Sequence, residues 1–119
     1  MKKILAVAFL LLSGCSFLQV SQFDGNEYGF VVNIRSTASI QKCTPENVQS
    51  LYENALNLKN YSQYLLHNEN SFKMSSSLFT LVDELHQKQT INETYCKLKL
   101  KSIEESAERI QKTLGGQSR

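Results

Sequence analysis

The chain has 119 residues, of which 13 are lysine or arginine and 11 are aspartate or glutamate, for a formal net charge of +2. This length allows one small domain, and a composition of 41% hydrophobic and 20% charged residues is typical of a chain that folds. The small net charge argues against nucleic-acid binding, which needs clustered basic residues, and a single proline excludes a proline-rich linker.

The first residues have the features of an export signal. Lys2 and Lys3 form a short positive segment, and the nine residues 4–12 carry no polar side chain. That stretch is far shorter than the ~20 residues that span a bilayer, but it suits the apolar part of a signal peptide. We therefore predict that residues 1–14 are a signal peptide.

The end of this segment carries a further motif. Leu12-Ser13-Gly14-Cys15 resembles the lipobox of bacterial lipoproteins, in which the cysteine thiol receives a diacylglyceryl group and the chain is cut before it. The resemblance implies a lipid on Cys15, and several acyl chains anchor a protein stably where one is marginal. Ser16 stands where an aspartate would imply retention in the inner membrane, so the resemblance implies the periplasmic face of the outer membrane. The alternative is an ordinary signal peptide in which Cys15 has no role.

Cleavage before Cys15 leaves a mature chain of 105 residues with 11 basic and 11 acidic side chains. We expect a lipidated tether over residues 15–23, a helical periplasmic domain over 24–116 and a tail over 117–119.

Residues 24–41 are expected to form a helix, with a strand as the alternative. Asp24 and Glu27 are spaced like a capping box. Against a helix, residues 30–32 are rich in β-forming types and Gly29 weakens helical structure. The residues that share the expected helix face are Tyr28, Val31, Arg35 and Ala38, bordered by Ile34.

Residues 44–67 are expected to form the next helix. Thr44 can cap it, Pro45 suits its first position and Glu46 suits its positive end. The Asn-Glu-Asn run at 68–70 is expected to end it. The apolar face expected for this helix consists of Val48, Leu51, Ala55, Leu58, Ser62 and Leu65.

A third helix is expected over residues 71–89, although three serines at 75–77 lower its intrinsic propensity, so that packing must hold it. The stripe expected along this helix consists of Met74, Leu78, Leu81 and Leu85, with Phe72, Phe79 and Val82 beside it.

The last helix has the most regular pattern. A capping box at 90–93 is expected to open it at Thr90, and Gly115-Gly116 to stop it. The apolar stripe of this helix could pack in the internal core or pair with a partner helix. We expect the core, because a domain this small needs the stripe to form one. The stripe residues are Cys96, Leu100, Ile103, Ala107, Ile110 and Leu114. The predicted fold class is all-α, a small bundle of three to four helices closed by one disulfide.

The expected disulfide joins Cys43 to Cys96, the pair that remains in an oxidising compartment. If successive helices run up and down, both cysteines lie at the same end of the bundle. The alternatives are two buried free thiols or bridges between molecules. Two cysteines without nearby histidines do not form a zinc site, so we expect no metal and no cofactor beyond the lipid.

The sequence lacks a phosphate-binding loop, a nucleophile elbow and a His-Glu-x-x-His motif, so we expect no enzymatic activity. Tyr52, Tyr61 and Tyr64 lie on one expected helix and are candidates for a partner interface, because tyrosine has a large apolar body and a polar tip. The alternative is that they fill the core. We predict a non-catalytic structural or protein-interaction lipoprotein whose partner is an envelope protein; the oligomeric state stays open.

A lysis function is the alternative. The short chain, the lipobox at 12–15 and the helical periodicity are similar, at the level of the class, to outer-membrane spanin subunits of bacteriophages. Those subunits pair with an inner-membrane coiled-coil partner and fuse the two membranes. This chain departs from the class because it has one proline, where many such subunits are proline-rich, and because it has the pattern of a domain with its own disulfide.

Overall fold

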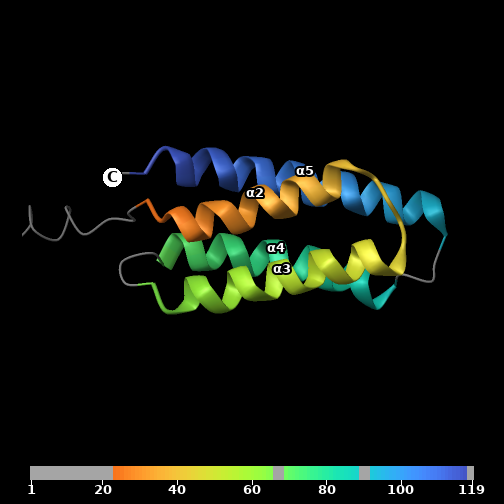
Figure 1. Cartoon of the computed structure of the whole chain (residues 1–119), viewed down its shortest axis with the longest axis horizontal. Helices are drawn as coiled ribbons and strands as arrows, with labels where there is room; N and C mark the ends of the chain where they lie inside the picture. The colour runs from red at the N-terminus through yellow and green to blue at the C-terminus, as the bar shows by residue number, and fades with distance from the viewer. Residues whose placement is uncertain (1–22, 66–68, 89–91, 118–119) are drawn as a thin grey trace, which may run out of the picture.

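The structure, a computed structural model, describes residues 23–65, 69–88 and 92–117. These residues form four α-helices and no strand: α2 (Gly25–Ser39), α3 (Pro45–Gln63), α4 (Glu69–Gln87) and α5 (Glu93–Gly115). Successive helices run in opposite directions, and each packs against two neighbours (Figure 1). The predicted all-α bundle is confirmed.

The two ends of the bundle gather different parts of the chain. The start of α2, the end of α3, the start of α4 and the end of α5 lie together, and we call this the Asp24 end (Figure 1). The loop between α2 and α3, the end of α4 and the start of α5 lie at the other end, which we call the disulfide end. Within the described ranges, no helix combines the length and the apolar character that crossing a membrane requires.

The first two helices begin where the sequence predicts. Asp24 caps α2 by accepting a hydrogen bond from the Glu27 backbone N–H at 2.9 Å, so the stretch expected as helix or strand is a helix. Thr44 caps α3 by accepting from the Asn47 N–H at 3.2 Å, and Pro45 occupies the first turn.

Three other boundaries differ from the prediction: the end of α3 and the starts of α4 and α5. The helix α3 ends at Gln63 rather than at residue 67, and the Asn-Glu-Asn run does not act only as a breaker, because Glu69 and Asn70 open α4. An acidic residue is favourable in the first turn of a helix, where the unpaired N–H groups give a positive end. The helix α5 begins after Asn92, whose side chain accepts from the Tyr95 N–H at 2.7 Å, and not at Thr90.

The core lies along the inner faces of the four helices. All six stripe residues predicted for α5 are buried, and so are five of the six predicted for α3, Leu65 being the exception because it lies beyond the end of the helix. The core side chains of α5 are Cys96, Leu100, Ile103, Ala107, Ile110 and Leu114.

The predicted face of α2 is rotated in the structure. Its buried residues are Glu27, Val31, Ile34 and Ala38, whereas Tyr28 and Arg35 are only partly buried. Tyr28 lies at the edge of the core, where its hydroxyl accepts a hydrogen bond from Gln111 Nε2 of α5, at 3.0 Å.

The predicted stripe of α4 is also partly wrong. Leu78 and Leu85 are buried as expected, but Ser71, Ser75 and Val82 take the inner positions that were assigned to Met74 and Leu81. Ser75 tolerates burial because its hydroxyl donates to the Phe72 carbonyl of its own helix at 3.0 Å. Met74, Phe79 and Leu81 pack against the edge of the core instead.

Candidate functional site

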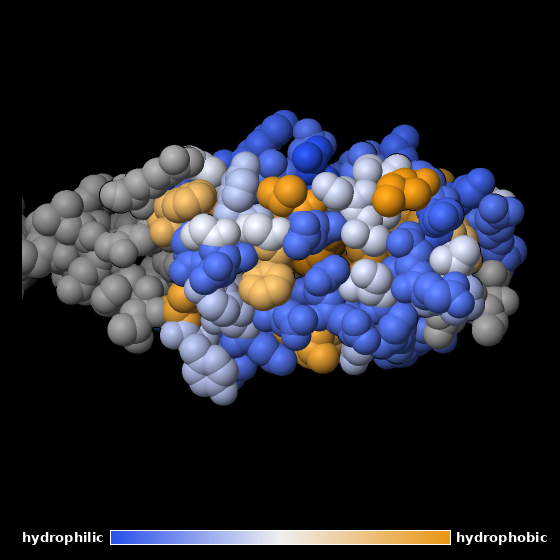
Figure 2. All heavy atoms as spheres, viewed as in Figure 1, coloured by the Kyte–Doolittle hydropathy of each residue, from blue (hydrophilic) through white to orange (hydrophobic). Residues whose placement is uncertain are grey.

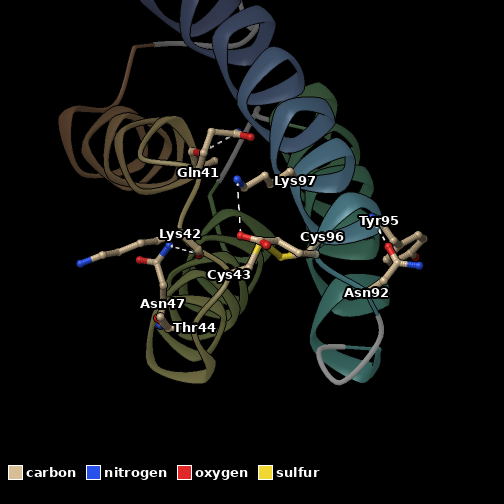
Figure 3. The surroundings of a disulfide bond; sticks show 11 residues. Gln41, Lys42, Cys43, Thr44, Asn47, Asn92, Tyr95, Cys96 and Lys97 are labelled. Carbon is tan, nitrogen blue, oxygen red and sulfur yellow. Dashed lines mark hydrogen bonds and ion pairs between the residues drawn. A yellow bond between two sulfur atoms is a disulfide. The ribbon is translucent and has the colours of Figure 1, made fainter.

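The disulfide end carries the bond predicted from the sequence. Cys43 lies just before the capping residue of α3, Cys96 lies near the start of α5, and the two are bonded with a Cα–Cα distance of 6.1 Å (Figure 3). Because α3 and α5 are packed on α2 and α4 rather than on each other, the bond crosses this end between diagonal helices. The prediction of a bridge within one chain is confirmed.

The loop that carries Cys43 is held by backbone and side-chain hydrogen bonds. Gln41 has a φ of 60°, a left-handed conformation that is uncommon outside glycine. Its backbone N–H and its Nε2 both donate to the Ala38 carbonyl at 3.1 Å. Asn47 Nδ2 donates to the Lys42 carbonyl at 2.9 Å, which ties the loop to α3. The sulfur of Cys43 is thus presented by a short segment fixed at both ends.

A surface hollow of about 350 Å³ opens beside the disulfide. An ion pair between Lys97 Nζ and Glu93 Oε1, 3.4 Å long, joins two of its lining residues, and Figure 3 places Lys97 next to the bonded cysteines. Cys43 is partly exposed, whereas Cys96 is 5% exposed. The hollow is lined by Gln41, Lys42, Cys43, Thr44, Glu93, Cys96 and Lys97.

The three candidate interface tyrosines do not share one surface. The Tyr52 ring stacks on His86 of α4 with a centroid distance of 4.1 Å, while Tyr61 contacts α2. Tyr64 is 81% exposed and follows the end of α3. Tyr52 and Tyr61 therefore connect helices inside the bundle, and partner binding through the tyrosines stays a prediction.

Tyr61 belongs to a hydrogen-bond network at the Asp24 end. Its hydroxyl donates to the Asp24 carboxylate at 2.9 Å and accepts from Asn26 Nδ2 at 3.3 Å, and its ring lies 5.8 Å from that of Phe30. Hydrogen bonding from Asn26 lowers the pKa of Tyr61, but burial and the Asp24 carboxylate outweigh it, so that the pKa is raised above 10.0. The network connects the cap of α2 to the end of α3.

A buried carboxyl group lies beside this network. Glu27 is 1% exposed, and Ser62 Oγ of α3 donates to its Oε2 at 2.6 Å. Burial raises the pKa of Glu27 above 4.5, the hydroxyls of Ser62 and Ser71 lower it in part, and Asp24 raises it. The sequence pattern assigned Glu27 to capping and did not identify this group. Its spacing from Val31, which places both on one helix face, is the signal that could have found it.

The predicted lipidation site, Cys15, and the rest of segment 1–22 lie outside the described residues. Within the described part of the chain, no group of three or more histidine, cysteine, aspartate or glutamate side chains is placed to hold a metal ion. Comparisons with protein-family models, with curated proteins and with solved structures find no match to this chain.

Proposed function

We propose that the protein is a lipid-anchored, non-catalytic structural or interaction module on the periplasmic face of the outer membrane. The observation that carries the proposal is the Leu12-Ser13-Gly14-Cys15 motif behind a positive and then an apolar segment. The disulfide supports it, because such bonds persist in oxidising compartments and are rare in the cytosol.

The position of the anchor then orients the bundle. Residue 23, the first described, is eight residues from Cys15, and eight residues reach at most about 28 Å. In this proposal the Asp24 end faces the membrane and the disulfide end points into the periplasm.

The exposed side chains suggest where a partner binds. Ile40 and Leu98 are each 63% exposed, and both belong to the half of the bundle nearer the disulfide end. On the face that Figure 2 shows, hydrophobic residues are separated by hydrophilic ones, as is usual for a surface without a large permanent interface. We propose that Ile40 and Leu98 contribute to contact with an envelope protein.

Spanin-like pairing with an inner-membrane coiled coil is the less favoured proposal. The regular stripe of α5, which resembles one side of a coiled-coil seam, is buried against α2 and α4. A coiled-coil partner would therefore bind another surface or require the bundle to open. Lysis on co-expression with such a partner, and none with either protein alone, would favour this second function.

Substitution of the proposed lipidation site tests the anchor. The wild-type protein is expected to incorporate labelled palmitate and to fractionate with the outer membrane, whereas Cys15→Ser is expected to do neither. Ser16→Asp serves as the matched variant, because it is expected to keep the label and to move to the inner membrane. A Cys15→Ser protein that fractionates as the wild type does would contradict the proposal.

A further inference from the structure

The two sulfurs of the disulfide differ in their surroundings. Cys43 is partly exposed in the loop between α2 and α3, and Cys96 is 5% exposed on the inner face of α5. An attacking thiolate approaches a disulfide along the S–S axis, from behind the sulfur that it attacks. Cys96 is carried on the inner face of α5, whereas Cys43 is carried by the loop just before α3 and is the more exposed of the two at the hollow of about 350 Å³ (Figure 3). The geometry therefore favours attack on Cys43.

Positive charge around the hollow favours the same reaction. Lys42, Lys97 and one carboxylate, Glu93, line it; Glu93 pairs with Lys97, and within the described ranges Lys42 forms no ion pair, so the lining carries a net positive charge. A positive field raises the local concentration of an incoming thiolate. Cys96 is the fourth residue of α5, close to the positive end of the helix dipole, which favours negative charge on a leaving sulfur and offsets part of the cost of its burial.

We propose that Cys43–Cys96 is a thiol–disulfide exchange site, in which Cys43 is the sulfur attacked and Cys96 is the leaving group. The incoming thiolate forms a bond to Cys43 Sγ, the Cys43–Cys96 bond breaks, and its electron pair leaves on Cys96 Sγ, which then takes a proton from water. Attack of the Cys96 thiolate on Cys43 reverses the step and releases the thiol. The exchange needs no oxidant beyond the disulfide itself.

The loop gives this exchange a structural consequence. Gln41 is held in a left-handed conformation next to Cys43, and such a backbone persists only where its surroundings fix it. A mixed disulfide on Cys43 removes the covalent tie to α5 while leaving the hydrogen bonds of Gln41 and Asn47 in place. Exchange thus opens the disulfide end locally, and the buried Cys96 stays positioned to close it again.

Peptide mapping after exchange with glutathione tests the choice of sulfur. The full chain, purified in detergent, is incubated with reduced glutathione, quenched with a fast alkylating reagent and digested with trypsin. Cleavage after Lys42, Lys59, Lys88 and Lys97 places the two cysteines in separate peptides, 43–59 and 89–97. We expect glutathione on Cys43 at least tenfold more often than on Cys96. Equal labelling of the two cysteines would overturn the proposal, and so would exchange that occurs only at urea concentrations that unfold the chain. The chain unfolded in urea serves as the reference for unselective labelling.

A second arm distinguishes the source of the thiolate. A thioredoxin-class oxidoreductase that retains only its attacking cysteine should be trapped on Cys43 if a protein dithiol uses the site, and glutathione alone should react if small thiols do. Absence of both adducts from the folded chain would overturn the proposal. Lys42→Gln should slow reaction with glutathione by about twofold to fivefold at low salt, while Lys101→Gln, an exposed position on α5 away from the hollow, should not.

Discussion

At the disulfide end a covalent bond joins the α2–α3 loop to α5, whereas at the Asp24 end hydrogen bonds around a buried carboxyl group join α2 to α3. The covalent bond stabilises the fold mainly by restricting the unfolded chain and does not depend on the ionisation of its neighbours. The hydrogen bonds at the Asp24 end must offset the cost of removing Glu27 from water. From this comparison we expect one end of the bundle to respond to thiols and the other end to respond to pH.

Removal of the disulfide is expected to have the largest effect. The bond closes a loop with a sequence separation of 53 residues, for which the chain-entropy account gives about 4 kcal/mol. The double variant Cys43→Ser, Cys96→Ser should therefore lose about 15–30 °C in Tm, measured by circular dichroism. Dithiothreitol should lower the Tm of the wild type and leave the double variant unchanged. A Tm that the double substitution does not lower would show that this end is held by packing alone.

Substitution of Glu27 tests the other end through its pH dependence. Because its pKa is raised in the folded state, the folded chain holds more protons than the unfolded chain between pH 4.5 and that higher pKa. The free energy of unfolding therefore falls as pH rises through this window, by at most about 1.4 kcal/mol per pH unit for one group, and the whole penalty is present above it. Glu27→Gln keeps an acceptor for Ser62 and removes the titration, so its stability should be flatter in this window and higher at pH 8.

Urea unfolding at a series of pH values measures this effect. Glu105→Gln is the matched control, because Glu105 is exposed on α5 and its side chain forms no hydrogen bond or ion pair within the described part of the chain. It should retain the wild-type slope. If Glu27→Gln and Glu105→Gln gave the same profile, burial of Glu27 would not determine the pH response of the Asp24 end.

The sequence predicts best the parts of the fold that depend on one helix at a time. The stripe of α5 was found completely because six apolar residues recur at helical spacing, and Thr44-Pro45 marks the start of α3 by local chemistry alone. The predicted α2 face omits Glu27: its spacing from Val31 places it on the buried side, but the Ser62 hydroxyl that makes its burial possible lies 35 residues away and is in no local pattern. The α4 stripe was misjudged because small serines, which a hydrophobic pattern ignores, occupy inner positions.

At the candidate site, too, the sequence predicts local features but not the contacts between separate segments. The cysteine pairing follows from the number of cysteines and from the expected oxidising compartment, but the hollow beside the bond depends on how the α2–α3 loop meets the start of α5. The separation of Tyr52 from Tyr61 was available in principle, since nine residues turn a helix by about 900°, which places the two on opposite sides. The helical period does not predict which residues of the neighbouring helices contact the Tyr52 and Tyr61 rings.

Tyr61→Phe should have the smallest effect of these changes and the most local one. The variant keeps the ring against Phe30 but loses the donor to Asp24, a hydrogen bond expected to contribute about 1 kcal/mol. Tyr64→Phe, at an exposed position, should change stability by less than about 0.5 kcal/mol.

Amide hydrogen exchange shows where the Tyr61 bond acts. Asp24 also caps α2 and protects the Glu27 N–H. When Asp24 loses the hydrogen bond from Tyr61, exchange at the Glu27 N–H should become faster, and by more than exchange at the start of α3. Equal changes at both ends would mean that the bundle opens only as a whole. Faster exchange confined to the Asp24 end would show that the start of α2 can open while the disulfide holds the other end closed. We expect this result because the bonds that fix the two ends share no residue.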